Sequence, residues 1–165
     1  MTATDLPGTT GEEYAREAEH RPLGGYAVLS ATLTAAVAGA LAGARGRLPE
    51  RIALQDVVLA GVATHKLSRI VAKDKVTSFI RAPFTRFQEP AGKGELEEKP
   101  RGRGLRLATG ELLVCPYCVA QWISAGFAVG YVHAPRLTRL FAGLYTMYAI
   151  SDGLQIAYLA AEERA

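Results

Sequence analysis

Cysteine is scarce in this chain of 165 residues, where Cys115 and Cys118 are its two copies. Two cysteines cannot build a disulfide framework, and they suit a reducing compartment or a single local pair. Net charge is also small, because 19 Lys and Arg side chains against 16 Asp and Glu side chains leave +3. That total gives no basis for nucleic-acid binding, and no nucleic-acid partner is predicted.

The pattern of a cleaved signal peptide is missing as well. Residues 26–44 are apolar and contain a small-residue motif, Ala42-Gly43-Ala44, of the kind found at cleavage sites. A signal peptide, however, begins with a short basic stretch, whereas five acidic side chains occur among residues 1–25. We therefore predict a retained membrane helix at 26–44, preceded by a mobile acidic N-terminal tail at 1–25.

Charged residues are absent from two long stretches, 26–44 and 112–134. Two further apolar stretches are interrupted by ionisable residues. Residues 140–161 contain Asp152. Residues 52–72 contain Asp56 and reach spanning length only when His65, Lys66 and Arg69 are included. About 20 apolar residues make one membrane span. The sequence thus predicts an all-α integral membrane bundle of about four transmembrane helices at 26–165, with a cytoplasmic loop at 73–111. If 52–72 does not span, the termini lie on opposite sides.

Basic residues decide the predicted orientation. In the four-span arrangement both termini and the 73–111 loop share one side of the membrane. Cytoplasmic loops carry an excess of Lys and Arg. Of the 19 basic residues, 14 lie on the side with the termini and the 73–111 loop. The opposite side has five: Arg45, Arg47, Arg51, Arg136 and Arg139. We expect a multi-pass protein of the cell membrane with both termini in the cytoplasm.

The central loop begins with an amphipathic pattern. Its apolar residues recur at helical spacing with cations around them, which is typical of a helix in the headgroup region of an anionic membrane. Packing of the same residues beneath the bundle is an alternative. Pro83 predicts a bend, and residues 88–104 predict an exposed loop or short hairpin. The predicted membrane-interface residues are Val76, Phe79, Ile80, Phe84 and Phe87.

Three motifs in this region resemble the bacterial domain-of-unknown-function family 1360. They are THKLSRIVAKDKVTSFIRAPFTRF from Thr64, EPAGKGELEEKPRG from Glu89, and GELLVCPYC from Gly110 together with Trp122. The resemblance covers roughly residues 52–158. It implies a small multi-span membrane protein, in a family where some members are labelled sporulation proteins and none has an established activity. No catalytic residue is carried over from it.

The Cys115-Pro116-Tyr117-Cys118 motif has the spacing used by thiol oxidoreductases and by half of a zinc site. Its letters match the glutaredoxin active site, but the βαβ context of that fold is missing. Two small buried cysteines on a helix are the structural alternative. A weaker alternative adds His65 as a third metal ligand, and no cofactor is predicted.

Counting residues from the predicted cytoplasmic ends places several polar side chains at similar depth, about 5 to 14 Å below the surface at 1.5 Å per residue. Charged groups at such depth normally pair with one another, so Asp152 is expected to pair with Lys66 or Arg69. Alternatively, the layer supplies reactive thiols or metal ligands. Asp56, near the outer end, is expected to be solvated. The predicted layer comprises His65, Lys66, Arg69, Cys115, Cys118, Gln121, Asp152 and Gln155.

Three function classes remain open on the sequence. The first is a non-enzymatic membrane or envelope component, linked to sporulation by the family resemblance, which uses its cytoplasmic loop to contact lipid headgroups and a protein partner. The second is a membrane thiol-redox or metal-binding protein centred on Cys115 and Cys118. The third is a small transporter or lipid-handling protein that uses Asp152. Formation of homo-oligomers is left open.

Overall fold

The computed structural model describes residues 21–44, 46 and 48–164. The first 20 residues of the predicted N-terminal tail lie outside this part. The described elements, in chain order, are α2 (Leu23–Gly43), α3 (Leu54–Lys73), α4 (Ser78–Arg81), β1 (Thr85–Gly92), β2 (Glu95–Pro100), α5 (Gly104–Val114), α6 (Pro116–His133) and α7 (Pro135–Glu162).

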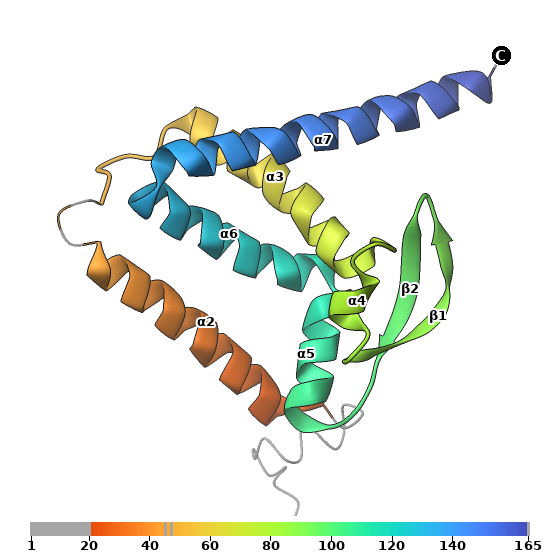
Figure 1. Ribbon diagram of the computed structural model, residues 1–165, viewed down its shortest axis with the longest axis horizontal. Coiled ribbons are helices and arrows are strands. Elements are labelled where there is room, and N and C mark those ends of the chain that lie inside the picture. Colours follow the sequence, from red (N-terminus) through yellow and green to blue (C-terminus); the bar gives the residue numbers. More distant parts are fainter. Residues whose placement is uncertain (1–20, 45, 47, 165) are drawn as a thin grey trace, which may run out of the picture.

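In the described part, the long helices α2, α3, α6 and α7 form the body of the protein (Figure 1). α7 crosses over α3 and α6, while α2 runs beside α6 and meets α5 at its own N-terminal end. α4 and the β1–β2 hairpin lie together near α5, at the end of α3, and the C-terminal part of α7 extends past the other helices. The predicted all-α class is confirmed, since the chain is mostly helical, although one hairpin is added.

Small residues lie where the helices approach each other most closely. The buried cluster between α3, α6 and α7 is formed by Ala63, Phe127 and Ala142. Gly25 of α2 lies so close to α5 that a Cβ there would come within 2.7 Å of the Ala108 Cβ. Such residues let helix backbones approach each other closely. The described core therefore contains few large apolar side chains.

The predicted continuous helix at 112–134 is wrong. α5 ends at Val114 and α6 begins at Pro116, and the two helices meet at an angle of 86°. Pro116 has no backbone N–H and disfavours a helical conformation in the preceding residue, so Cys115 is extended, with φ −102° and ψ 105°. The proline then occupies the first position of α6, where a missing N–H leaves no bond unmade.

The amphipathic helix predicted from Val76 to Phe87 is also wrong. Helix α4 covers only Ser78–Arg81, the chain turns at Pro83, and Phe87 lies in β1. The predicted short hairpin is confirmed, because β1 and β2 pair antiparallel, with Thr85 opposite Pro100 and Gly92 opposite Glu95.

Among the described residues, α2 is the one helix that is long and apolar enough to cross a membrane by itself. Helices α5 and α6 meet the same requirement only when they are counted together as one broken span. α3 and α7 are long enough but carry more charge. The composition of the helices thus supports one membrane span, or two, and does not confirm the predicted four.

Candidate functional site

An ion pair joins the middle of α3 to α7. The Lys66 ammonium contacts the Asp152 carboxylate, and its Nζ also lies 3.9 Å from the centroid of the Tyr148 ring. Only 12% of the Lys66 side chain is exposed. A cation over an aromatic face gains further electrostatic attraction. The pair predicted between Asp152 and a cation of α3 is thus present, with Lys66 as the partner.

The next two cations of α3 contact the hairpin instead. Arg69 Nη2 lies 2.6 Å from Glu95 Oε2, and Lys73 Nζ lies 2.8 Å from Glu97 Oε2. Arg69 is therefore not the partner of Asp152. The two contacts hold β2 against the last two turns of α3.

Arg81 is the largest fully buried side chain in the described part, and it is not among the site residues predicted from the sequence. It pairs with Glu98 of β2, whose side chain is 5% exposed. Its guanidinium also donates to the carbonyl oxygens of Val71, at 2.7 Å, and Asp74, at 2.9 Å. Because the last carbonyls of a helix have no partner within the helix, Arg81 completes the C-terminal end of α3.

Asp56 is not solvated, contrary to expectation. It is 6% exposed, and Arg139 of α7 donates to both of its carboxylate oxygens, from Nη2 at 2.7 Å and from Nε at 2.9 Å. The Tyr131 hydroxyl donates to the Asp56 backbone carbonyl at 3.1 Å. This two-bond geometry is the strongest form of an arginine–carboxylate contact. α3 and α7 are therefore joined by one ion pair near the N-terminal end of α3 and by a second in its middle.

The two cysteines touch at the bend between α5 and α6. Their sulfur atoms are 2.7 Å apart, and the backbone N–H of Cys118 donates to Cys115 Sγ at 3.3 Å. Cys115 is half-buried and Cys118 is exposed, and both are free thiols. Cys115 is the N-cap of α6, and Cys118 follows three residues later in its first turn.

The predicted polar layer is brought together only in pairs. Lys66 contacts Asp152 and Cys115 contacts Cys118, whereas Arg69 contacts Glu95 outside the layer. The other three members, His65, Gln121 and Gln155, are exposed. Groups of three or more His, Cys, Asp or Glu side chains that could hold a metal ion do not occur in the part of the chain described here. The common depth of these residues in a membrane stays a prediction.

The predicted interface residues are largely exposed. Val76 and Phe79 are 75% and 72% exposed, and Ile80 and Phe87 are exposed as well. Phe84 is partly buried near the turn that follows α4.

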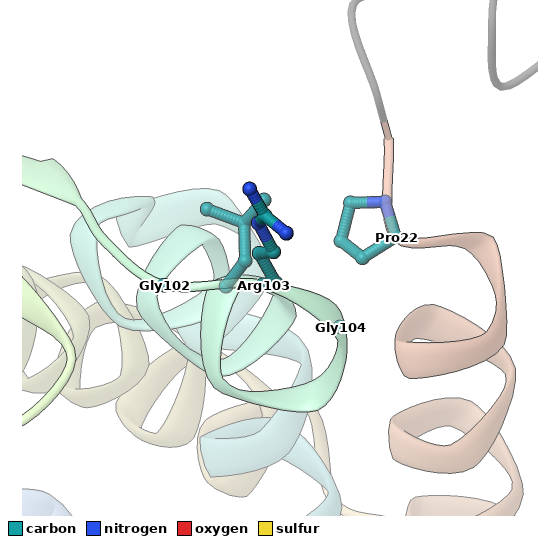
Figure 2. Close-up of a pocket in the computed structure, with 5 residues that line it drawn as sticks. Pro22, Gly102, Arg103 and Gly104 are labelled. Carbon is teal, nitrogen blue, oxygen red and sulfur yellow. The ribbon is translucent and has the colours of Figure 1, made fainter.

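The described part contains two cavities with few polar side chains in their linings. One, of about 450 Å³, lies between the starts of α2 and α5, with Arg103 at its rim (Figure 2). The residues that line it are Pro22, Gly102, Arg103, Gly104 and Leu107. None of them has an acidic, imidazole, thiol or hydroxyl side chain. The other, of about 530 Å³, is an apolar groove between α3, α6 and α7 whose one polar side chain is Thr138.

Comparison with known proteins gives a family but no activity. The family model described as protein of unknown function (DUF1360) matches residues 59–158. The chain is similar to the UPF0713 protein YngL of Bacillus subtilis (strain 168), with 26% identity over 91 residues. That match covers 53% of this chain and 66% of the relative. No solved structure matches.

Proposed function

This chain belongs to the DUF1360 family of proteins of unknown function, and from the exposed surface of its helices we propose that it is a multi-pass membrane component without enzymatic activity. It contacts lipid headgroups, and a protein partner, through the region between α3 and α6. The sporulation link that the family resemblance implies is part of this proposal.

The exposed apolar surface of α7 carries the proposal. At 100° per residue the large exposed side chains occupy an arc of roughly 240° around the helix. The apolar stripe of a helix in a soluble protein is about 100° wide. One flat partner surface does not cover so wide an arc, whereas lipid does. These residues are Leu137, Leu140, Phe141, Leu144, Met147, Tyr148, Ile150, Leu154, Ile156, Tyr158 and Leu159.

α2 supports the same conclusion. It contains no charged residue, and Gly25 is its one buried residue. Apolar patches of more than a few hundred Å² are rare on soluble monomers and mark interaction or membrane surfaces. A helix that is apolar all round and yet unburied within its own protein fits a bilayer.

Ion pairing supports α3 and α7 as additional spans. Their charged residues keep them from qualifying by composition, but Asp56 pairs with Arg139 and Lys66 pairs with Asp152. Arg69 and Lys73, near the end of α3, are neutralised by the hairpin. Charged side chains in membrane helices are tolerated when they face the bundle and pair with one another. α2, α3, α6 and α7 then give both termini and the hairpin a common, cytoplasmic side.

The test uses two matched glutamate-to-cysteine variants in a Cys115→Ser/Cys118→Ser background. Glu50→Cys lies in the connection between α2 and α3, and Glu89→Cys lies on β1; both positions are exposed. A membrane-impermeant maleimide should label Glu50→Cys in intact cells and Glu89→Cys only after permeabilisation. The protein should also stay in membranes that are washed with alkaline carbonate.

Two results would contradict the proposal. Release of the protein by carbonate would show a peripheral protein whose apolar helices are covered by other chains. Labelling of Glu89→Cys from outside intact cells would overturn the orientation.

A further inference from the structure

We propose that Cys115 and Cys118 form a reversible intramolecular disulfide, which makes the start of α6 a redox-sensitive modification site. Neither thiol takes part in the ion pairs described above, and the proposed membrane role does not depend on either of them. This inference therefore goes beyond the proposed function and does not depend on how many helices span.

The positions of the two sulfurs carry the proposal. They are 2.7 Å apart, and a disulfide bond is about 2.0 Å long, so a small rotation of the two side chains brings them to bonding distance. The bond would close within one helical turn, between the N-cap of α6 and the residue three positions later. No rearrangement of distant elements is needed.

Access to the pair is also suitable. Cys118 is exposed, and the intervening Tyr117 is 89% exposed. Reactive cysteines are partly exposed, whereas structural cysteines are normally closed off in a core. The 86° bend at Cys115 keeps α5 from continuing over the sulfurs as a straight helix would. The sequence alternative of two buried structural cysteines does not fit this exposure.

Metal binding is the competing use of two adjacent thiols. A structural zinc site takes four protein ligands. Within residues 21–44, 46 and 48–164 no third His, Cys, Asp or Glu side chain joins the pair in a metal-binding group. Thiol–disulfide exchange, in contrast, needs two sulfurs and an external disulfide.

The oxidant in this step is a disulfide R–S–S–R of a small thiol or of another protein. Cys115, as the thiolate, attacks one sulfur of R–S–S–R, forms a mixed disulfide and expels RS⁻. Cys118 then loses its proton and attacks the Cys115 sulfur, which forms the Cys115–Cys118 bond and expels a second RS⁻. Two electrons pass from the protein to the oxidant, and the two thiol protons end on two RSH molecules.

Cys115 is assigned as the attacking sulfur because it accepts both hydrogen bonds of the pair. The backbone N–H and the thiol of Cys118 donate to it. Hydrogen bonds donated to a sulfur favour its charged form, and the thiolate is the nucleophile.

The experiment equilibrates the full chain in detergent with graded mixtures of reduced and oxidised glutathione, and then counts free thiols with maleimide–polyethylene glycol. We expect two adducts under reducing conditions and none under oxidising conditions, with a midpoint that does not change with protein concentration. The Cys118→Ser variant should take up one glutathione severalfold faster than Cys115→Ser.

Retention of two adducts in fully oxidised glutathione would overturn the proposal, as would disulfide-linked dimers as the oxidised product. Equal glutathione uptake by the two serine variants would overturn the assignment of Cys115. Because the thiols are counted in detergent, a negative result leaves the membrane topology unaffected, and a failed topology leaves the thiol count unaffected.

Discussion

Lys66 and Asp152 form an ion pair between residues 86 positions apart in the sequence, and the ring of Tyr148 lies against the same ammonium group. We expect Asp152→Asn to lower the free energy of unfolding by about 1–3 kcal/mol, because it leaves a largely buried ammonium without its charged acceptor. Thermal unfolding of the purified protein in detergent, followed by circular dichroism, measures the change.

The control for this prediction is Gln155→Asn, which shortens an exposed side chain one turn further along α7. It should change stability by less than about 0.5 kcal/mol. In a double-mutant cycle, Lys66→Met combined with Asp152→Asn should lose less than the sum of the single variants. Additive losses, or larger losses from Cys115→Ser and Cys118→Ser, would show that this pair does not stabilise the helix packing.

Arg81 provides the second prediction. Arg81→Met should destabilise the protein by about 3–5 kcal/mol, because it leaves the buried Glu98 carboxylate without its cationic partner. It also removes the donors at the end of α3. The hairpin should then become sensitive to limited proteolysis, which is read out on a gel.

Arg86→Met is the matched control, since Arg86 is exposed on β1. It should leave the proteolysis pattern unchanged. If both variants are cleaved at the same rate, the buried guanidinium does not hold the hairpin.

A pair of helical glycines gives the third prediction. At Gly110 of α5 a Cβ would come within 2.6 Å of the Phe84 carbonyl oxygen, whereas at Gly126 of α6 nothing lies within 4 Å. Gly110→Ala should therefore destabilise the protein by about 1–3 kcal/mol through overpacking. Gly126→Ala should be neutral or stabilising by up to about 1 kcal/mol, because alanine favours helix. Equal unfolding temperatures for the two variants would contradict the close contact between α5 and the Phe84 turn.

The sequence predicted α2, α3 and α7 and one of the contacts between helices. Uninterrupted apolar composition located α2, and counting depth along 52–72 and 140–161 brought Asp152 opposite the cations of α3. That succeeded because both residues are on long helices, where position follows from a constant rise per residue. The 86° bend between α5 and α6 was not predicted, because the uncharged apolar stretch at 112–134 was interpreted as one helix. Pro116, which directly follows Cys115, was the available signal for it.

The remaining contacts depend on tertiary structure. Helical spacing from Val76 to Phe87 favoured an amphipathic helix with a bend at Pro83, but Arg81 donates to carbonyls at the end of α3, and Phe87 pairs within a strand. The helical spacing of five apolar residues does not reveal either of these two contacts. Asp56 pairs with Arg139, which is 83 positions away in the sequence. This contact depends on how α3 packs against α7, which no local sequence pattern specifies. The acidic run in β2 was a usable signal, because three carboxylates there face three cations of the α3–α4 region.

The exposed apolar surface of α4 provides the last prediction. Phe79 is 72% exposed and lies a few residues after the cations at the end of α3. An exposed phenylalanine beside basic residues is attracted to the headgroup region of an anionic bilayer. In a Cys115→Ser/Cys118→Ser background, a spin label at Phe79→Cys should therefore collide more with oxygen, which partitions into lipid, than with a water-soluble nickel chelate.

Lys93→Cys, at the exposed turn of the hairpin, is the matched position within the same loop and should show the opposite preference. Exchange of anionic vesicles for zwitterionic ones should weaken the oxygen preference at Phe79→Cys, because part of the attraction is electrostatic and falls off within a Debye length. Rapid aqueous tumbling at both positions would mean that the exposed phenylalanine does not enter the lipid and is available to bind a protein partner. Strong immobilisation at Phe79→Cys without oxygen access would instead mean that it packs beneath the helix bundle, which the exposure of this side chain argues against.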